Sequence, residues 1–152
     1  MKYLVIFYSE SGNTEQVARA IAGALGVEAR RIDTIKPEDL VSYDLICIGT
    51  PVQGARPAKS VLKFIEAMPH LPGKRVAIFC TMHLFGSKKV VKSARLLFEE
   101  KGLVFLGGFC CKGWSRLVAN FGPRMFNRGR PSAKDLKMAE EFGRGLLASS
   151  LK

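Results

Sequence analysis

The sequence lacks several features that mark common classes of protein. No apolar run approaches the roughly 18 residues that a membrane span needs, and residues 1–3 lead straight into an expected strand without room for a cleavable signal. There is no Cys-x-x-Cys pair to hold a metal and no His-Glu-x-x-His. No combination of serine, histidine and aspartate, and no pair of carboxylates, indicates hydrolysis. We therefore expect a cytoplasmic protein without a membrane span, a metal site or catalytic residues.

The common nucleotide-binding motifs are missing too. Gly73-Lys74 lacks a glycine five residues earlier and is followed by Arg75, so it is not a triphosphate-binding loop, and no Gly-x-Gly-x-x-Gly occurs. The chain has no zinc finger, helix-turn-helix signature or ladder of aromatics, although its net charge is +11. These absences argue against nucleic acid as a partner.

Acidic side chains are scarce in one part of the chain only. Residues 67–134 carry thirteen basic and two acidic side chains, whereas residues 1–66 carry eight of each and residues 135–152 three of each. The whole net charge therefore comes from the middle and later part of the chain. Such asymmetry concerns partners and association rates, and it predicts attraction to an acidic partner.

What is present is typical of a globular α/β protein. At 152 residues with 47% hydrophobic content, the chain is long enough for one domain, residues 1–152, with its own core. Apolar runs at residues 3–8, 27–32, 44–49, 75–80 and 103–109 predict five strands. Helical spacing of apolar residues predicts helices at 15–25, from 58 to before Pro69, around 90–98, and at 132–147, where Ser132 is the expected N-cap. This alternation predicts a doubly wound, five-stranded parallel sheet with helices on both faces.

Four cysteines do not require disulfides in a cytoplasmic chain of this size. We expect Cys47 and Cys80 to be small core residues. Adjacent cysteines pair poorly, so Cys110 and Cys111 are expected as two thiols at a strand end, on opposite faces.

The turn at residues 9–14 is the most specific feature of the sequence. It joins the first strand to a helix for which Thr14 is the expected N-cap. The first N–H groups of that helix and the hydroxyls of Ser9, Ser11 and Thr14 converge on one point, where the helix dipole favours an anion. Because the turn contains no lysine or arginine, it suits a monophosphate better than a triphosphate.

Ser9-x-Ser11-Gly12-x-Thr14 after a first strand resembles the FMN-phosphate loop of the flavodoxin-like family of short, single-domain proteins. Gly49-Thr50-Pro51 with Gly54 and Pro57 is similar to the family's second flavin loop, and the stretch from Gly129 to Phe142 is similar to its closing helix. The resemblance implies a flavodoxin-like fold and FMN as the cofactor. Three loops beyond strand carboxyl ends would bind it. The implied cofactor-binding residues are Ser9, Glu10, Ser11, Gly12, Asn13 and Thr14 for the phosphate; Thr50, Pro51, Val52, Gln53, Gly54 and Ala55 along the isoalloxazine; and Thr81, Met82, His83, Leu84, Phe85 and Gly86 at its pyrimidine end.

The chain departs from that family in two respects. Flavodoxins are usually acidic and clamp the flavin between two aromatics, whereas residues 50–57 contain no aromatic. Phe85 or His83 is a candidate for stacking on one flavin face, against the alternatives of a core or solvent-facing side chain. Residues 110–131 form a long basic connection in which Trp114, Leu117, Val118 and Phe121 have the spacing of a short helix. This connection either covers the flavin edge and docks an anionic partner or is a solvated loop.

The resemblance implies a redox carrier, and the basic middle of the chain predicts that it exchanges electrons with an acidic redox protein. The main alternative is an NAD(P)H-dependent FMN or quinone oxidoreductase, whose second substrate stacks on the open flavin face. A third possibility is a binding module of the same fold without flavin. The sequence leaves the partner and the oligomeric state open.

Overall fold

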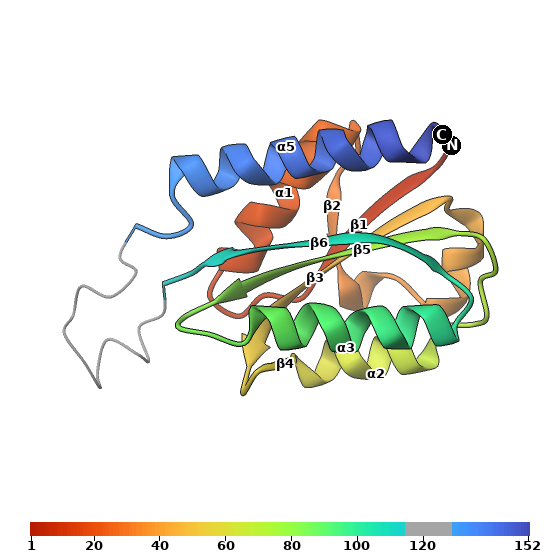
Figure 1. The fold of residues 1–152 in the computed structure, drawn as a ribbon, viewed down its shortest axis with the longest axis horizontal. Coiled ribbons are helices and arrows are strands. Elements are labelled where there is room, and N and C mark those ends of the chain that lie inside the picture. Colours follow the sequence, from red (N-terminus) through yellow and green to blue (C-terminus); the bar gives the residue numbers. More distant parts are fainter. Residues whose placement is uncertain (115–128) are drawn as a thin grey trace.

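The computed structural model describes residues 1–114 and 129–152, and five parallel strands form its centre (Figure 1). The sheet has the order β2-β1-β3-β5-β6, in which β1 is Tyr3–Phe7, β2 Ala29–Arg31, β3 Leu45–Gln53, β5 Arg75–Met82 and β6 Val104–Lys112. A two-residue strand, β4 (Arg56–Pro57), pairs antiparallel with the end of β3. The predicted doubly wound parallel sheet is confirmed, with this short strand added.

Among the described residues, helices cover both faces of the sheet (Figure 1). Helices α1 (Asn13–Leu25) and α5 (Ala133–Ser150) lie on one face, and α2 (Lys59–Ala67) and α3 (Ser87–Glu100) on the other. Because β1, β3 and β5 are buried on both faces, their sequences are continuous apolar runs. Two 3-10 turns, η1 (Ile32–Thr34) and η2 (Pro37–Ser42), lead from β2 toward β3.

The last helix begins as its sequence predicts. The Ser132 hydroxyl accepts a hydrogen bond from the Asp135 N–H, and the Asp135 carboxylate accepts one from the Ser132 N–H. This reciprocal capping box satisfies two donors at the helix start. Arg130 adds an ion pair to Asp135, with 2.7 Å between Nε and Oδ2.

Several boundaries differ from the sequence-based expectation; for example, β5 ends at Met82 instead of Cys80, and α3 begins at Ser87 instead of about residue 90. Helix α1 begins at Asn13 with Gly12 as its N-cap, so Thr14 is not the cap. Strand β3 continues to Gln53, because residues 52–53 pair with β4. Strand β6 continues to Lys112, because Met82 and Lys112 still pair at the end of β5 and β6.

The state of the cysteines differs from the expectation in one respect, because two of the four are joined in a disulfide. Cys47 and Cys80 are core residues, and Cys110 and Cys111 face opposite sides of the sheet, as predicted. However, Cys80 and Cys110 form a disulfide. They occupy paired positions on the neighbouring parallel strands β5 and β6, which brings their side chains together on one face.

No helix among residues 1–114 and 129–152 is both long and apolar enough to cross a bilayer. The short helix expected from Trp114 to Phe121 falls largely outside the described residues, and so do Arg116, Arg124 and Arg128 of the basic connection.

Candidate functional site

Three chain segments converge where the strand order reverses. From β1 the chain passes through α1 to β2 on one side, and then crosses to β3 on the other side of β1. Ligands of open α/β sheets bind at such a switch point, beyond the strand carboxyl ends. The first segment (residues 9–14) follows β1, the second (residues 50–55) ends β3, and the third (residues 81–86) ends β5.

The first segment presents backbone N–H donors at the start of a helix. The Ser9 hydroxyl accepts a hydrogen bond from the Gly12 N–H at 3.0 Å, which closes the turn. Gly12 has a φ of 86°, a left-handed conformation that favours glycine, and a side chain there would meet nothing within 4 Å. The N–H groups of Asn13, Thr14 and Glu15 have no acceptor among the described residues. The helix start is therefore an open group of donors at the positive end of the α1 dipole.

Buried hydrogen bonds fix this helix start to the strands around it. The Thr14 and Thr81 hydroxyls lie 2.7 Å apart, and both residues are buried, so the first and third segments are joined directly. Asn13 is also buried, and its side-chain amide donates to the Trp114 carbonyl at 2.7 Å. Trp114 in turn donates its N–H to the Arg130 carbonyl at 3.1 Å.

The second segment is a strand end and a tight turn, not the predicted loop. Gly54 and Ala55 connect β3 to β4, and both have positive φ, 56° and 60°. The Thr50 hydroxyl is buried and accepts a hydrogen bond from the Ala58 N–H at 2.8 Å, which ties the strand end to the start of α2. Gln53 and Gly54 are exposed at the tip.

The third segment packs directly against the second. A side chain at Gly86 would lie 2.8 Å from the Ala55 Cα, so only glycine permits this approach. His83 is half-buried, and its ring nitrogen Nδ1 lies 3.0 Å from the Gly113 carbonyl oxygen. Phe85 is 74% exposed and therefore not a core residue. A hollow of about 330 Å³ lies beside this loop.

One carboxylate lies among these segments. Glu10 accepts a hydrogen bond from the Tyr8 hydroxyl at 2.7 Å and a longer one, 3.5 Å, from the Gln53 side chain. The hydrogen bond to Glu10 is the main cause that raises the pKa of Tyr8 above its ordinary value, and desolvation adds to it. Glu10 thus links the first segment to the tip of the second.

All eighteen residues predicted for the site lie on these segments, but their side chains play different parts. Thr14, Thr50 and Thr81 use their hydroxyls within the protein, whereas Ser11, Gly54 and Phe85 lie at the surface or close to it. Trp114 and Gly113, which contact Asn13 and His83, were not predicted as site residues. No local pattern marks them, because their backbone carbonyls make the contacts.

The comparisons with known proteins agree with this geometry. Residues 4–142 match the flavodoxin domain family. An uncharacterized protein of Methanocaldococcus jannaschii is 32% identical over 151 residues, which cover 97% of this chain and 99% of the relative. A flavodoxin of Megasphaera elsdenii is 29% identical over 111 residues, covering 68% of this chain and 80% of the relative. The solved structure of a flavodoxin from the domain Archaea shares the fold over 100% of both chains, with a TM-score of 0.76 at 19% identity.

The strand order and its switch point are consistent with the family match, which covers residues 4–142. The chain belongs to the flavodoxin domain family, a family of FMN-binding electron-transfer proteins.

Proposed function

We propose that this protein is an electron carrier that holds FMN at the three segments 9–14, 50–55 and 81–86. The observation that carries the proposal is the group of N–H donors at the start of α1 that have no acceptor in the described part of the chain, placed at the switch point of the sheet. Bound FMN would supply one-electron chemistry, while the protein binds it, orients it and sets the charge around it.

The first segment suits the phosphate. The N–H groups of Asn13, Thr14 and Glu15 point out of the helix start, and Ser11 adds an exposed hydroxyl. No lysine or arginine lies in residues 9–14, so a monophosphate would be held by these N–H groups and the helix dipole. The Thr14 hydroxyl is hydrogen-bonded to that of Thr81, so it positions the helix start against the third segment.

The second and third segments suit the flavin ring. The turn at Gly54-Ala55 and the backbone at Gly86 form one packed wall, and the residues proposed to line the ring are those predicted from the sequence on both segments. Phe85 is the exposed aromatic available to cover one face. The second segment has no aromatic to cover the other, so that face is proposed as the one open to a partner.

The proposed partner is an acidic redox protein. Lys88 and Lys89 lie in the first turn of α3, just beyond the third segment, and are exposed, and Lys112 ends the neighbouring strand β6. Opposite charge on a partner would raise the rate of encounter and orient it toward the flavin.

The test is a visible absorption spectrum of the purified protein followed by stopped-flow reduction. A carrier is yellow, is reduced by a reductase or ferredoxin and does not respond to NADPH alone. Rapid bleaching by NADPH alone would identify the oxidoreductase alternative instead, and a protein that binds no FMN on titration would refute the proposal. The cytoplasmic location remains a prediction, which fractionation of cells would test.

A further inference from the structure

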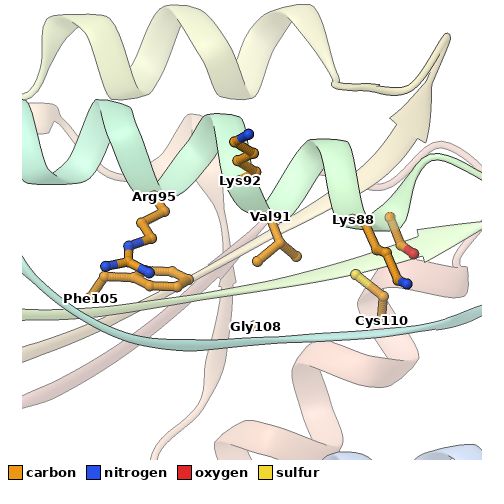
Figure 2. Close-up of a pocket in the computed structure, with 8 residues that line it drawn as sticks. Lys88, Val91, Lys92, Arg95, Phe105, Gly108 and Cys110 are labelled. Carbon is orange, nitrogen blue, oxygen red and sulfur yellow. The ribbon is translucent and has the colours of Figure 1, made fainter.

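A cavity of about 440 Å³ lies between α3 and the edge strand β6 (Figure 2). It begins at Ser87, directly after the third segment, and extends along the helix to Arg95. The helix contributes Lys88, Lys92 and Arg95, and β6 contributes Phe105 and Cys110. The cavity therefore combines a cationic wall with an apolar floor that includes a sulfur-bearing residue.

The cationic wall favours an anion. Residues 88, 92 and 95 lie on one face of α3 because they are four and three positions apart. Arg95 is partly neutralised by Glu99, with 2.7 Å between Nε and Oε1, and its guanidinium lies 5.9 Å from the centre of the Phe105 ring. Lys88 and Lys92 form no ion pair within the part of the chain that the structure describes. Two cations that line the cavity thus have no ion-pair partner among the described residues, and the Lys88 side chain points toward β6, whereas that of Lys92 points away from it (Figure 2).

The Cys80–Cys110 disulfide opens onto this cavity from one side only. Cys110 is half-buried and lines the cavity, whereas Cys80 is fully buried in the core between the sheet and helices α2 and α3. Of the two cysteines only Cys110 lines the cavity, so its Sγ is the one that we expect a small molecule there to reach. The bond therefore has one accessible sulfur, next to a cationic wall.

We propose that this cavity is a thiol–disulfide exchange site for a small thiol that also carries an anionic group. The thiolate sulfur bonds to Cys110 Sγ while the Cys80–Cys110 bond breaks, and the electron pair of that bond passes to Cys80 Sγ. Cys80 then takes up a proton, since a thiolate in the apolar core is costly. The product is a mixed disulfide on Cys110.

A second thiol molecule completes the exchange. Its thiolate attacks the sulfur of the first small molecule, a small-molecule disulfide leaves, and the Cys110 thiolate that remains takes up a proton. In sum, two small thiols are oxidised to one disulfide and the protein disulfide is reduced to two thiols, so atoms and electrons balance. The small thiol is the reductant, and no bound cofactor takes part.

Selectivity for an anionic thiol follows from the wall. Lys88 and Lys92 attract the second anionic group and raise the local concentration of the thiolate itself. The two free cysteines do not compete, because burial raises the pKa values of Cys47 and Cys111 to about 12 each. Cys110 is therefore the one expected site of modification among the four cysteines.

The test compares three thiols of similar size that differ in charge: 3-mercaptopropionate, 3-mercaptopropan-1-ol and cysteamine. Mixed disulfides formed on the purified full chain at low salt are trapped with acid, counted by mass spectrometry and corrected for the thiolate fraction of each thiol. The Cys111→Ser variant places the adduct on Cys110 without ambiguity. Should that variant fail to fold, fragmentation of the wild-type peptide separates the two adjacent positions.

We expect a single adduct on Cys110, with the anionic thiol reacting about fivefold faster than the alcohol and cysteamine slowest. Lys88→Gln with Lys92→Gln should remove most of this preference. Lys59→Gln with Lys63→Gln, an equally exposed pair at the same spacing on α2, is the matched control and should leave it unchanged. An inert disulfide, equal rates for all three thiols in the wild type, or an adduct on another cysteine would each overturn the proposal.

Discussion

Thr14 lies in the first turn of α1, but its hydroxyl bonds to Thr81 in the interior. The sequence predicted it as the N-cap, because serine and threonine at a helix start commonly serve that purpose. Gly12 is the N-cap instead, since its left-handed backbone turns the chain into the helix. Local sequence does not separate these two roles, because Thr81 lies 67 residues away.

Replacing Thr14 by valine should destabilise the protein by about 1 to 3 kcal/mol, because the buried Thr81 hydroxyl would lose its partner. The Thr14→Val, Thr81→Val double variant should regain much of that loss, since both polar groups are then gone. Urea unfolding of the three variants gives the coupling free energy. Losses that simply add would mean that the two hydroxyls are independently satisfied.

Gly12 allows a comparison between the two ends of one helix. Gly12 and Gly26 both have left-handed backbones, with φ of 86° and 68°, and a side chain at either meets nothing within 4 Å. Alanine at either position should therefore cost roughly 1 to 2 kcal/mol of stability through backbone strain. Only Gly12→Ala disturbs the donors proposed to hold the phosphate.

Gly12→Ala should accordingly weaken FMN binding by about tenfold and leave riboflavin binding almost unchanged. Gly26→Ala should affect neither ligand. Fluorescence titration of both variants with both ligands measures this difference. Equal losses for FMN and riboflavin in Gly12→Ala would place the phosphate elsewhere.

At the scale of elements, the hairpin that ends β3 was not predicted. Residues 50–57 contain two prolines, which argue against a strand interior, and the turn lacks the asparagine-glycine pair that commonly marks a two-residue hairpin. Gly54 and Ala55 nevertheless adopt the two left-handed conformations that such a turn requires. In this conformation Ala55 packs against Gly86, which lies far away in the sequence, so local sequence could not predict the contact.

Ala55→Gly should therefore stabilise the protein by roughly 0.5 to 1 kcal/mol. The backbone strain of an alanine at φ 60° costs more free energy than the extra conformational entropy that glycine gives to the unfolded chain. Ala148→Gly, in the exposed part of α5, is the control and should destabilise by about 1 kcal/mol. Denaturant midpoints of the two variants should move in opposite directions, and a shared downward shift would show that the turn at Ala55 is unstrained.

The disulfide is a second feature that local sequence does not predict, because it depends on which strands pair and in which register. Apolar runs predicted that Cys80 and Cys110 lie in or at the end of strands, but runs of this kind do not fix strand neighbours or register. Strands β5 and β6 are neighbours, and their register shifts between Val76 and Ala77, after which Cys80 stands opposite Cys110. A one-residue difference would have put the two sulfurs on opposite faces.

For the molecule as a whole, the sequence was sufficient for the family, the fold and FMN-binding electron transfer, and the family match confirms these predictions. The first segment, residues 9–14, carries most of that information, because a strand-to-helix turn with one glycine and several hydroxyls is distinctive. The individual site residues and the single domain remain predictions. Side-chain contacts between segments required the structure, since each depends on residues more than 40 positions apart.

The charge distribution carries the last prediction, which rests on the proposed function. Residues 67–134 have a net charge of +11, thirteen basic minus two acidic, and they contribute the third segment of the site. One charge about 10 Å from the flavin is worth roughly 0.4 kcal/mol in water and about 1.6 kcal/mol at an effective dielectric near 20. For a one-electron couple this corresponds to roughly 20 to 70 mV.

Positive charge favours the more negative, reduced form of the cofactor, whereas the carboxylates of an acidic flavodoxin oppose it. We therefore expect the potential of the second one-electron step to be less negative than in acidic relatives. It should become more negative as salt screens the cations, because the screening length falls to about 10 Å at 0.1 M. Spectroelectrochemical titration at two salt concentrations measures this, with Lys88→Gln and Lys89→Gln as variants close to the site. Lys152→Gln is the control, because the exposed C-terminus lies at the opposite end of the sheet from the three segments (Figure 1). A potential that does not move with salt would place the effective positive charge away from the flavin, and the basic region would then act on partner encounter alone.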